Sequence, residues 1–131
     1  MKQASLYLKA LVVSSSAITT ACGSRIYPIA APAGVNDFPF VTFEHQSRPG
    51  DGTKDGDKRV VDAAISVVSR TALEAEELSD SLLPAMYSYC ESDSNTFSGT
   101  FYDPEFSKEE ELYIPDIDAF VVRLHITFET K

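Results

Sequence analysis

The strongest pattern in the chain is an alternation between an apolar and a polar face from Phe120 to Phe128, within positions 119–129. Successive side chains of a strand point to opposite faces of a sheet, so this period of two predicts a C-terminal core strand. The other, mostly polar face of this strand carries Val121, Arg123, His125, Thr127 and Glu129. The apolar face, which we expect to be buried beneath helices, carries Phe120, Val122, Leu124, Ile126 and Phe128.

A helical period appears in two other segments. Residues 1–22 place one stripe at spacings of three and four, which predicts an N-terminal helical region ended by Gly23. Residues 71–86 predict the main helix, because Thr71 and Glu74 form a capping box at its start. We expect Pro84 to kink or end this helix, since proline lacks a backbone N–H. The N-terminal stripe consists of Ala4, Leu8, Leu11, Ser15, Ile18 and Cys22.

A pair of strands is predicted between these helical segments. Residues 38–45 have the aromatic and β-branched content of a strand, and residues 60–70 alternate like the C-terminal segment. Residues 46–58 are rich in turn formers and have almost nothing to bury, which predicts a long mobile loop between the two strands. The proline-rich residues 25–34 predict a connector before the pair.

After the main helix, residues 96–102 predict one more strand, which Asp103 and Pro104 end. Residues 106–115 contain the charged run 108–111 and predict a solvated loop before the last strand. The whole order predicts an α+β fold with a mostly antiparallel sheet of about four strands and two main helices packed on one face. A chain of 131 residues is the usual size of a single domain.

The charge balance narrows the classes of function. Twenty acidic against eleven basic residues give a net charge of -9, and no basic cluster longer than Lys58 and Arg59 is present. Tight binding of nucleic acid is therefore disfavoured, although an acidic surface suits DNA that must slide past without adhering. Cys22 and Cys90 are the only cysteines and could form one bridge, but they lack metal-ligand spacing and two cysteines do not suggest a disulfide framework.

Residues 1–22 also allow a second interpretation, as a secretion signal. Lys2 and Lys9 precede an apolar stretch, and Cys22 follows Ala21 as a lipidated cysteine would. Serines and threonines dilute this stretch, and Thr19 stands where lipoprotein signals usually carry leucine, so the helical interpretation is the better one. No stretch is long and apolar enough to span a bilayer.

Candidate chemical sites in the sequence are weak. The loop after residue 50 partly matches a calcium site, with Asp51, Thr53, Asp55, Gly56 and Asp62 at ligand or turn positions. It lacks the bidentate glutamate and has strands on both flanks, so an acidic solvent loop is favoured. The two histidines, His45 and His125, have no local spacing for metal or nucleophile chemistry, and residues 109–111 lack the burial that acid catalysis needs. We expect no enzyme, no cofactor and no metal.

Several short pieces together resemble a known family. The N-terminal helix leads through Gly23 into Arg25, Ile26, Tyr27 and Pro28, and then through a proline-rich connector into an aromatic strand. A loop-linked strand pair, an amphipathic helix, an aromatic-acidic turn and a final alternating strand follow in order. This order resembles the small tail completion, or tail terminator, proteins of long-tailed bacteriophages and prophages, which join head to tail.

The resemblance implies a structural role in the virion, with assembly in the host cytoplasm. It implies a homo-oligomeric ring, with six as the expected number, on the head-proximal end of the tail tube. Such a ring stops polymerisation of the tube protein, offers a surface to the head connector and lets DNA pass through its lumen, with no membrane involved. A head-side connector or stopper is the alternative within this class, and a secreted or lipid-anchored binding module is the alternative from another class.

Candidate interface residues come from the mobile loop and the last strand. We expect the 46–58 loop to become ordered against a neighbouring subunit or the tail tube during assembly. In a ring, the polar face of the last strand would lie near an interface or the lumen. The candidates are Arg48, Asp51, Lys54, Asp55, Asp57, Arg123 and His125.

Overall fold

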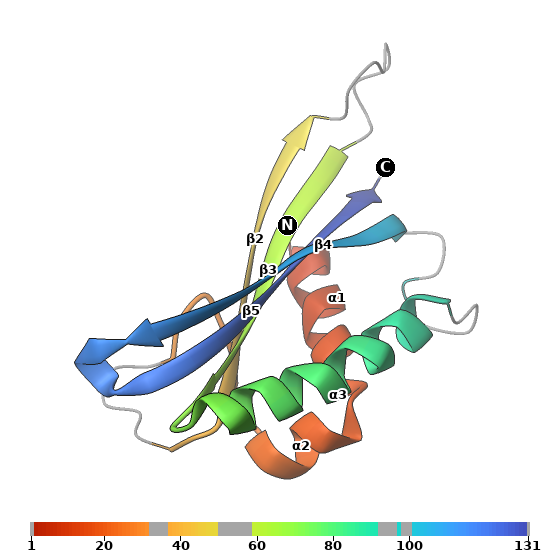
Figure 1. The fold of residues 1–131 in the computed structure, drawn as a ribbon. Helices are drawn as coiled ribbons and strands as arrows, with labels where there is room; N and C mark the ends of the chain where they lie inside the picture. Colours follow the sequence, from red (N-terminus) through yellow and green to blue (C-terminus); the bar gives the residue numbers. More distant parts are fainter. Residues whose placement is uncertain (1, 32–36, 50–58, 92–96, 98–100, 131) are drawn as a thin grey trace.

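A computed structural model describes residues 2–31, 37–49, 59–91, 97 and 101–130. Within these residues, the sheet has five strands in the order β1-β2-β3-β5-β4, and three α-helices lie together on one side of it (Figure 1). The strands are β1 Ile26–Pro28, β2 Phe40–Pro49, β3 Arg59–Ser69, β4 Phe101–Ile114 and β5 Ala119–Thr130. The helices are α1 Lys2–Val13, α2 Ser16–Cys22 and α3 Ala72–Glu91, with a short 3-10 helix η1 at Pro115–Ile117.

The N-terminal stripe lies in the core. All six of its residues are buried, and five of them join the main apolar cluster with α3 and the helix-facing side of the sheet. The stripe is divided between two helices that meet at an angle of 92°. Ser15 makes this corner, because its Oγ accepts a hydrogen bond from the N–H of Ile18 at 3.3 Å and caps α2. Gly23 ends α2 with φ 59°, a backbone conformation that favours glycine.

No single helix in the described ranges is long and apolar enough to cross a membrane. Only the bent pair α1 and α2 reaches the necessary length and composition when its two helices are taken together. The residues that make this pair apolar include the stripe that packs into the core.

Helix α3 begins as expected and continues past its proline. The N–H of Glu74 donates to Oγ1 of Thr71 at 3.2 Å, which is half of a capping box. The carboxylate of Glu74 completes the cap differently, because it accepts from the hydroxyl of the fully buried Ser69. Of the two expected effects of Pro84, a kink or an end, the end is wrong, because α3 continues to Glu91. Leu82 and Met86 are both fully buried on either side of Pro84, so packing holds the last turns in place.

The prediction of about four strands misses β1. The proline-rich connector forms this short strand, which pairs in parallel with β2 from Ile26 opposite Val41 to Pro28 opposite Phe43. All other neighbouring strands are antiparallel, so the sheet is mixed. The expected loop at 46–58 also starts too early. Residues 46–49 pair with β3 and extend β2 to Pro49, and residues 50–58 lie outside the described part of the chain.

The largest error concerns residues 103–115, expected as a strand end and a solvated loop. They form most of β4, which pairs with β5 along its length apart from two register shifts between Tyr102 and Lys108. Pro104 and the charged run 108–111 are compatible with a strand here because β4 lies at the sheet edge, where one side of the backbone needs no partner. The β4–β5 hairpin extends to the left beyond the helices in Figure 1.

Strand β5 largely follows its sequence pattern. Val122, Leu124, Ile126 and Phe128 are buried under the helices, whereas Phe120 is only half-buried because it lies near the protruding end of the hairpin. On the opposite face, β5 contributes to a second and smaller apolar cluster, which is not expected from the alternation. Its buried members are Phe40, Val68, Ala119 and Val121.

Candidate functional site: the polar part of the outer face

We call the sheet side without helices the outer face. The second apolar cluster occupies one end of this face, where Tyr27, Ala31 and Phe38 pack on it. Arg70 places its guanidinium 4.4 Å from the centre of the Phe38 ring and partly covers this end. Polar and charged side chains from β2, β3, β5 and β4 occupy the rest of the face. They make the polar part of the outer face the candidate site.

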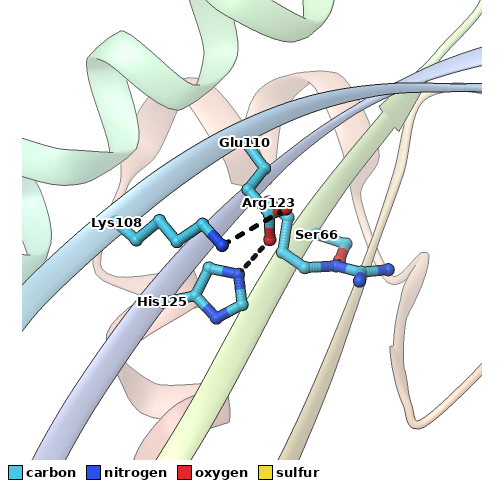
Figure 2. Close-up of polar contacts among 5 residues, drawn as sticks. All are labelled: Ser66, Lys108, Glu110, Arg123 and His125. Carbon is cyan, nitrogen blue, oxygen red and sulfur yellow. Dashed lines mark hydrogen bonds and ion pairs between the residues drawn. The ribbon is translucent and has the colours of Figure 1, made fainter.

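Glu110 and His125 form the centre of this polar part, together with Lys108 (Figure 2). Nε2 of His125 lies 2.5 Å from Oε1 of Glu110, and Nζ of Lys108 lies 3.5 Å from Oε2 of the same carboxylate. The hydrogen bond from His125 is the main cause that lowers the pKa of Glu110, and the charge of Lys108 adds to it. An ionised carboxylate can only accept, so Nε2 of His125 carries the shared proton.

Two more polar contacts continue across the sheet. Nε of Arg123 donates to Oγ of Ser66 at 3.2 Å, which links β5 to β3 (Figure 2). Closer to the open end of β2, Nε of Arg48 lies 3.0 Å from Oδ2 of Asp62, whose Oδ1 accepts from Thr127 at 3.1 Å. Both charged side chains of the Arg48–Asp62 pair are about half exposed, so the pair contributes little to stability.

Three of the predicted interface residues therefore lie on one face. Arg48, Arg123 and His125 are all on the outer face and all have polar partners there. The other four, Asp51, Lys54, Asp55 and Asp57, lie outside the described residues. The same holds for most of the partial calcium loop, and its last position, Asp62, is engaged by Arg48.

The remaining chemical candidates are separated in space. His45 lies on the helix side of the sheet, where its Nε2 is 2.9 Å from Oγ of Ser5 and burial lowers its pKa. Cys22 and Cys90 are unpaired. Burial raises the pKa of Cys22 to about 11, and the Cys90 sulfur lies 3.3 Å from the Tyr7 hydroxyl. Within the described ranges, no group of three His, Cys, Asp or Glu side chains gathers around a potential metal position.

Sequence reasoning missed Lys108 and Glu110 because their segment was expected to be a loop. Spacing by two residues would place both on one face of a strand, which was the available signal. The alternation is weak there because Glu109 and Glu111, on the other face, are equally polar. Only pairing with β5 puts Glu110 opposite Arg123 and Lys108 opposite His125.

A hollow and a protruding tip flank the polar part of the outer face. The hollow, about 510 Å³, lies beside the end of β1 and is lined by Ile29, Glu44, Ala64 and His125 among others. At the other sheet edge, the tip of the β4–β5 hairpin exposes a group of large apolar side chains. These are Leu112, Tyr113, Ile114 and Ile117.

A groove of about 270 Å³ runs between this tip and the start of α3. At its side, the carboxyl groups of Glu76 and Glu111 are hydrogen-bonded, and this contact is the main cause that raises the pKa of Glu76. Two carboxylates can share such a contact only while one of them keeps its proton. The groove therefore carries repulsion between like charges at neutral pH.

The comparisons with known proteins agree with the resemblance in the sequence. A family model described as Tail completion protein gp17 matches residues 7–129, nearly the whole chain. The chain belongs to this family. The tail completion proteins are structural components of the phage virion, and membership places this chain in the tail or neck of the particle. No curated protein sequence matches the chain.

The fold of this tail completion protein also occurs in a solved virion. A chain in the structure of the virion of a native gene transfer agent particle aligns with a TM-score of 0.62 and 16% sequence identity. The alignment covers 95% of this chain and 89% of that chain. At this identity the likeness concerns the fold alone.

Proposed function

We propose that this tail completion protein forms a closed ring of six subunits at the head-proximal end of the tail tube. The ring stops polymerisation of the tube and offers a surface to the head connector. The observation that carries the proposal is the match of the family model over residues 7–129. The function requires interfaces and a lumen and needs no catalytic group.

The shape of the subunit supports a ring. A closed ring needs two different surfaces on each subunit that meet head to tail. The sheet offers such a pair, because its two edges differ in sequence and structure: the long strand β4 forms one, and β2 with the short β1 forms the other. The hairpin that extends beyond the helices adds a protruding element that a neighbour can receive (Figure 1).

The net charge of -9 supports the passage of DNA. An acidic lumen repels the phosphate backbone and keeps DNA from adhering while it slides. We assign the polar part of the outer face, with Glu110 near its centre, to a subunit interface or to the lumen. Acidic residues confined to the outer wall of the assembled ring would refute a role for this charge in DNA passage.

Electron microscopy of the purified protein, alone and mixed with tail tubes of its phage, tests the proposal. We expect rings, and we expect each ring to cap one end of a tube and stop its further growth. Tubes that keep growing at both ends in the presence of the protein would refute termination. Binding to isolated heads in preference to tubes would instead assign the protein to the head side, as a connector or stopper.

A further inference from the structure

The outward edge of β4 is open. Among the described residues, β4 pairs only with β5, so its other side presents unpaired N–H and C=O groups. The first half of β4 carries the register shifts between Tyr102 and Lys108, and such irregularities discourage pairing with another strand. Residues 108–114 are regular, which leaves seven consecutive residues able to accept a new strand.

The opposite edge of the sheet is open over half of β2. Strand β1 covers only Val41 to Phe43, and within the described chain no strand pairs with the outward side of Glu44–Pro49. The hollow beside Ile29 lies at this point, and the Ile29 side chain is 75% exposed. An uncovered strand edge of six residues therefore begins where β1 ends.

Backbone hydrogen bonds at β1 show which residues of β2 face this open edge. The N–H of Val41 donates to the carbonyl of Arg25 at 3.0 Å, and the carbonyl of Phe43 accepts from Ile29 at 2.7 Å. The N–H and C=O of one strand residue point to the same side, and the side alternates along the strand. His45 and Ser47 therefore direct their backbone groups away from β3.

The same alternation can be followed across the sheet to β4. The pairings of β2 with β3, of β3 with β5 and of residues 108–114 with β5 contain no register shift. The backbone N–H and C=O groups of even-numbered residues in β2 point toward β3. Because the registers are continuous, the backbone groups of even-numbered residues in β4 point toward β5. The β4 residues with backbone groups on the open side are Glu109, Glu111 and Tyr113.

We propose that residues 108–114 of one copy add as an antiparallel strand to the open half of β2, Glu44–Pro49, in a second copy of this chain. The inference rests on the proposed ring and names its subunit contact. β4 runs antiparallel to β2 within one subunit, because three antiparallel pairings separate them. Rotation about an axis parallel to the strands preserves their directions, so neighbouring subunits meet in antiparallel pairs.

Charge favours this contact over a two-fold pairing of β4 with β4. Residues 105–111 carry four glutamates and one lysine, so two copies of β4 would bring like charges to one seam. The open half of β2 carries Glu44 and Arg48, and the residues opposite it in β3 add Asp62 and Arg59. The positive and negative charges at this edge cancel, whereas the whole chain has a net charge of -9, so this edge is the one suited to the acidic strand.

One antiparallel register satisfies both charge and apolar contacts. Placing Glu110 opposite Arg48 on the outer face puts Leu112 opposite Gln46 and Ile114 opposite Glu44. The apolar hairpin tip then meets the exposed Ile29 beside the hollow. This contact covers apolar side chains that are exposed in the isolated subunit at both edges of the sheet.

Two proline variants test the contact, one for each edge. Ser47→Pro and Glu111→Pro each remove an outward N–H and leave the internal ladder intact, and Pro49 already occupies an outward position on β2. Ser47→Ala and Glu111→Ala are the matched controls, because they shorten the same side chains and keep the N–H. Thermal unfolding followed by circular dichroism verifies that all four variants fold.

Sedimentation of each variant alone and of an equimolar mixture gives the result. We expect rings for the wild type and the alanine controls, monomers for each proline variant, and dimers for the mixture, since one intact interface remains between the two variants. Rings of both proline variants would overturn the strand pairing and leave the proposed function standing. A dimer of Ser47→Pro alone would indicate β4–β4 pairing and also overturn it. A wild type that stays monomeric at all concentrations overturns self-association, and tube capping then decides the proposed function separately.

A cysteine pair tests the register. Gln46 and Leu112 would be a non-hydrogen-bonded pair, with Cα atoms about 4.5 Å apart, which is close enough for a disulfide. Gln46→Cys combined with Leu112→Cys should give a ladder of covalently linked oligomers on oxidation, up to the size of the ring. Each single variant should give dimers at most. A double variant that gives no more than the single variants would overturn this register.

Discussion

The contact of Phe128 with two other rings offers a quantitative test of the core. Phe128 is fully buried, and its ring lies 5.1 Å from Tyr7 of α1 and 5.1 Å from Phe101 of β4, both in edge-to-face geometry. The side chain therefore joins the N-terminal helix, the edge strand and the central strand β5. Replacing it with alanine removes both ring contacts at one position.

The expected cost of Phe128→Ala can be estimated from this burial. Phenylalanine to alanine changes in a packed core cost about 3–5 kcal/mol. The two ring pairs account for about 0.5–1.5 kcal/mol each within that figure. A domain of this size has a total stability of about 5–15 kcal/mol, so the variant should lose a large fraction of it. The corresponding fall in Tm is roughly 10–20 °C.

Urea denaturation of Phe128→Ala and of Phe120→Ala checks the estimate. Phe120 is on the same face of β5 but only half-buried, with the Tyr113 ring 5.0 Å away, so its replacement should cost about 1–2 kcal/mol. Phe128→Leu, which keeps most of the apolar volume, should fall between the two. Equal costs for Phe128→Ala and Phe120→Ala would refute the placement of Phe128 at the centre of the core.

Three further changes have expected results that follow from single contacts. Glu111→Gln removes the charge beside Glu76, whose pKa is raised, so the contact between the two carboxyl groups stabilises the fold below the usual glutamate pKa and is lost as pH rises through the raised value. The variant should therefore resist urea better than wild type near neutral pH and show no advantage near pH ~4. Equal gains at both pH values would contradict this reasoning. Glu110→Gln removes a carboxylate whose pKa is lowered by the hydrogen bond from His125. In urea titrations at a series of pH values, wild type should be more stable than the variant above the usual glutamate pKa and should lose that advantage as pH falls through the lowered value. Thr71→Ala removes the cap on the Glu74 N–H and should cost about 0.5–2 kcal/mol in urea denaturation, while Thr71→Ser should cost much less; equal losses would exclude the hydroxyl as the cap.

Where a sequence pattern reports burial directly, it predicted this fold well. The alternation in β5 and the stripe in residues 1–22 each identify positions that the structure buries, because a strand or helix with one apolar face can hide it in only one way. The capping pattern at Thr71 located the start of α3 for a similar local reason.

The sequence-based predictions failed where tertiary contacts override the local preference of a segment for helix, strand or loop. Pro84 should interrupt a helix, yet buried Leu82 and Met86 stabilise α3 on both sides of it. The run 108–111 looks like a solvated loop, yet backbone pairing with β5 makes it a strand. Proline and charge are tolerated on β4 because it lies at the edge, and the order of strands in the sheet is not encoded in any single segment.

The sequence by itself determined which faces of the last strand and the N-terminal helices are apolar, and it contained the resemblance to tail completion proteins. The tertiary structure alone decided which polar residues meet, since His125, Glu110 and Lys108 come together only through the β4–β5 register. It also decided which strand edges stay open, because an edge is defined by the strand that is missing beside it. That property belongs to the whole sheet, and it is the one on which assembly between subunits depends.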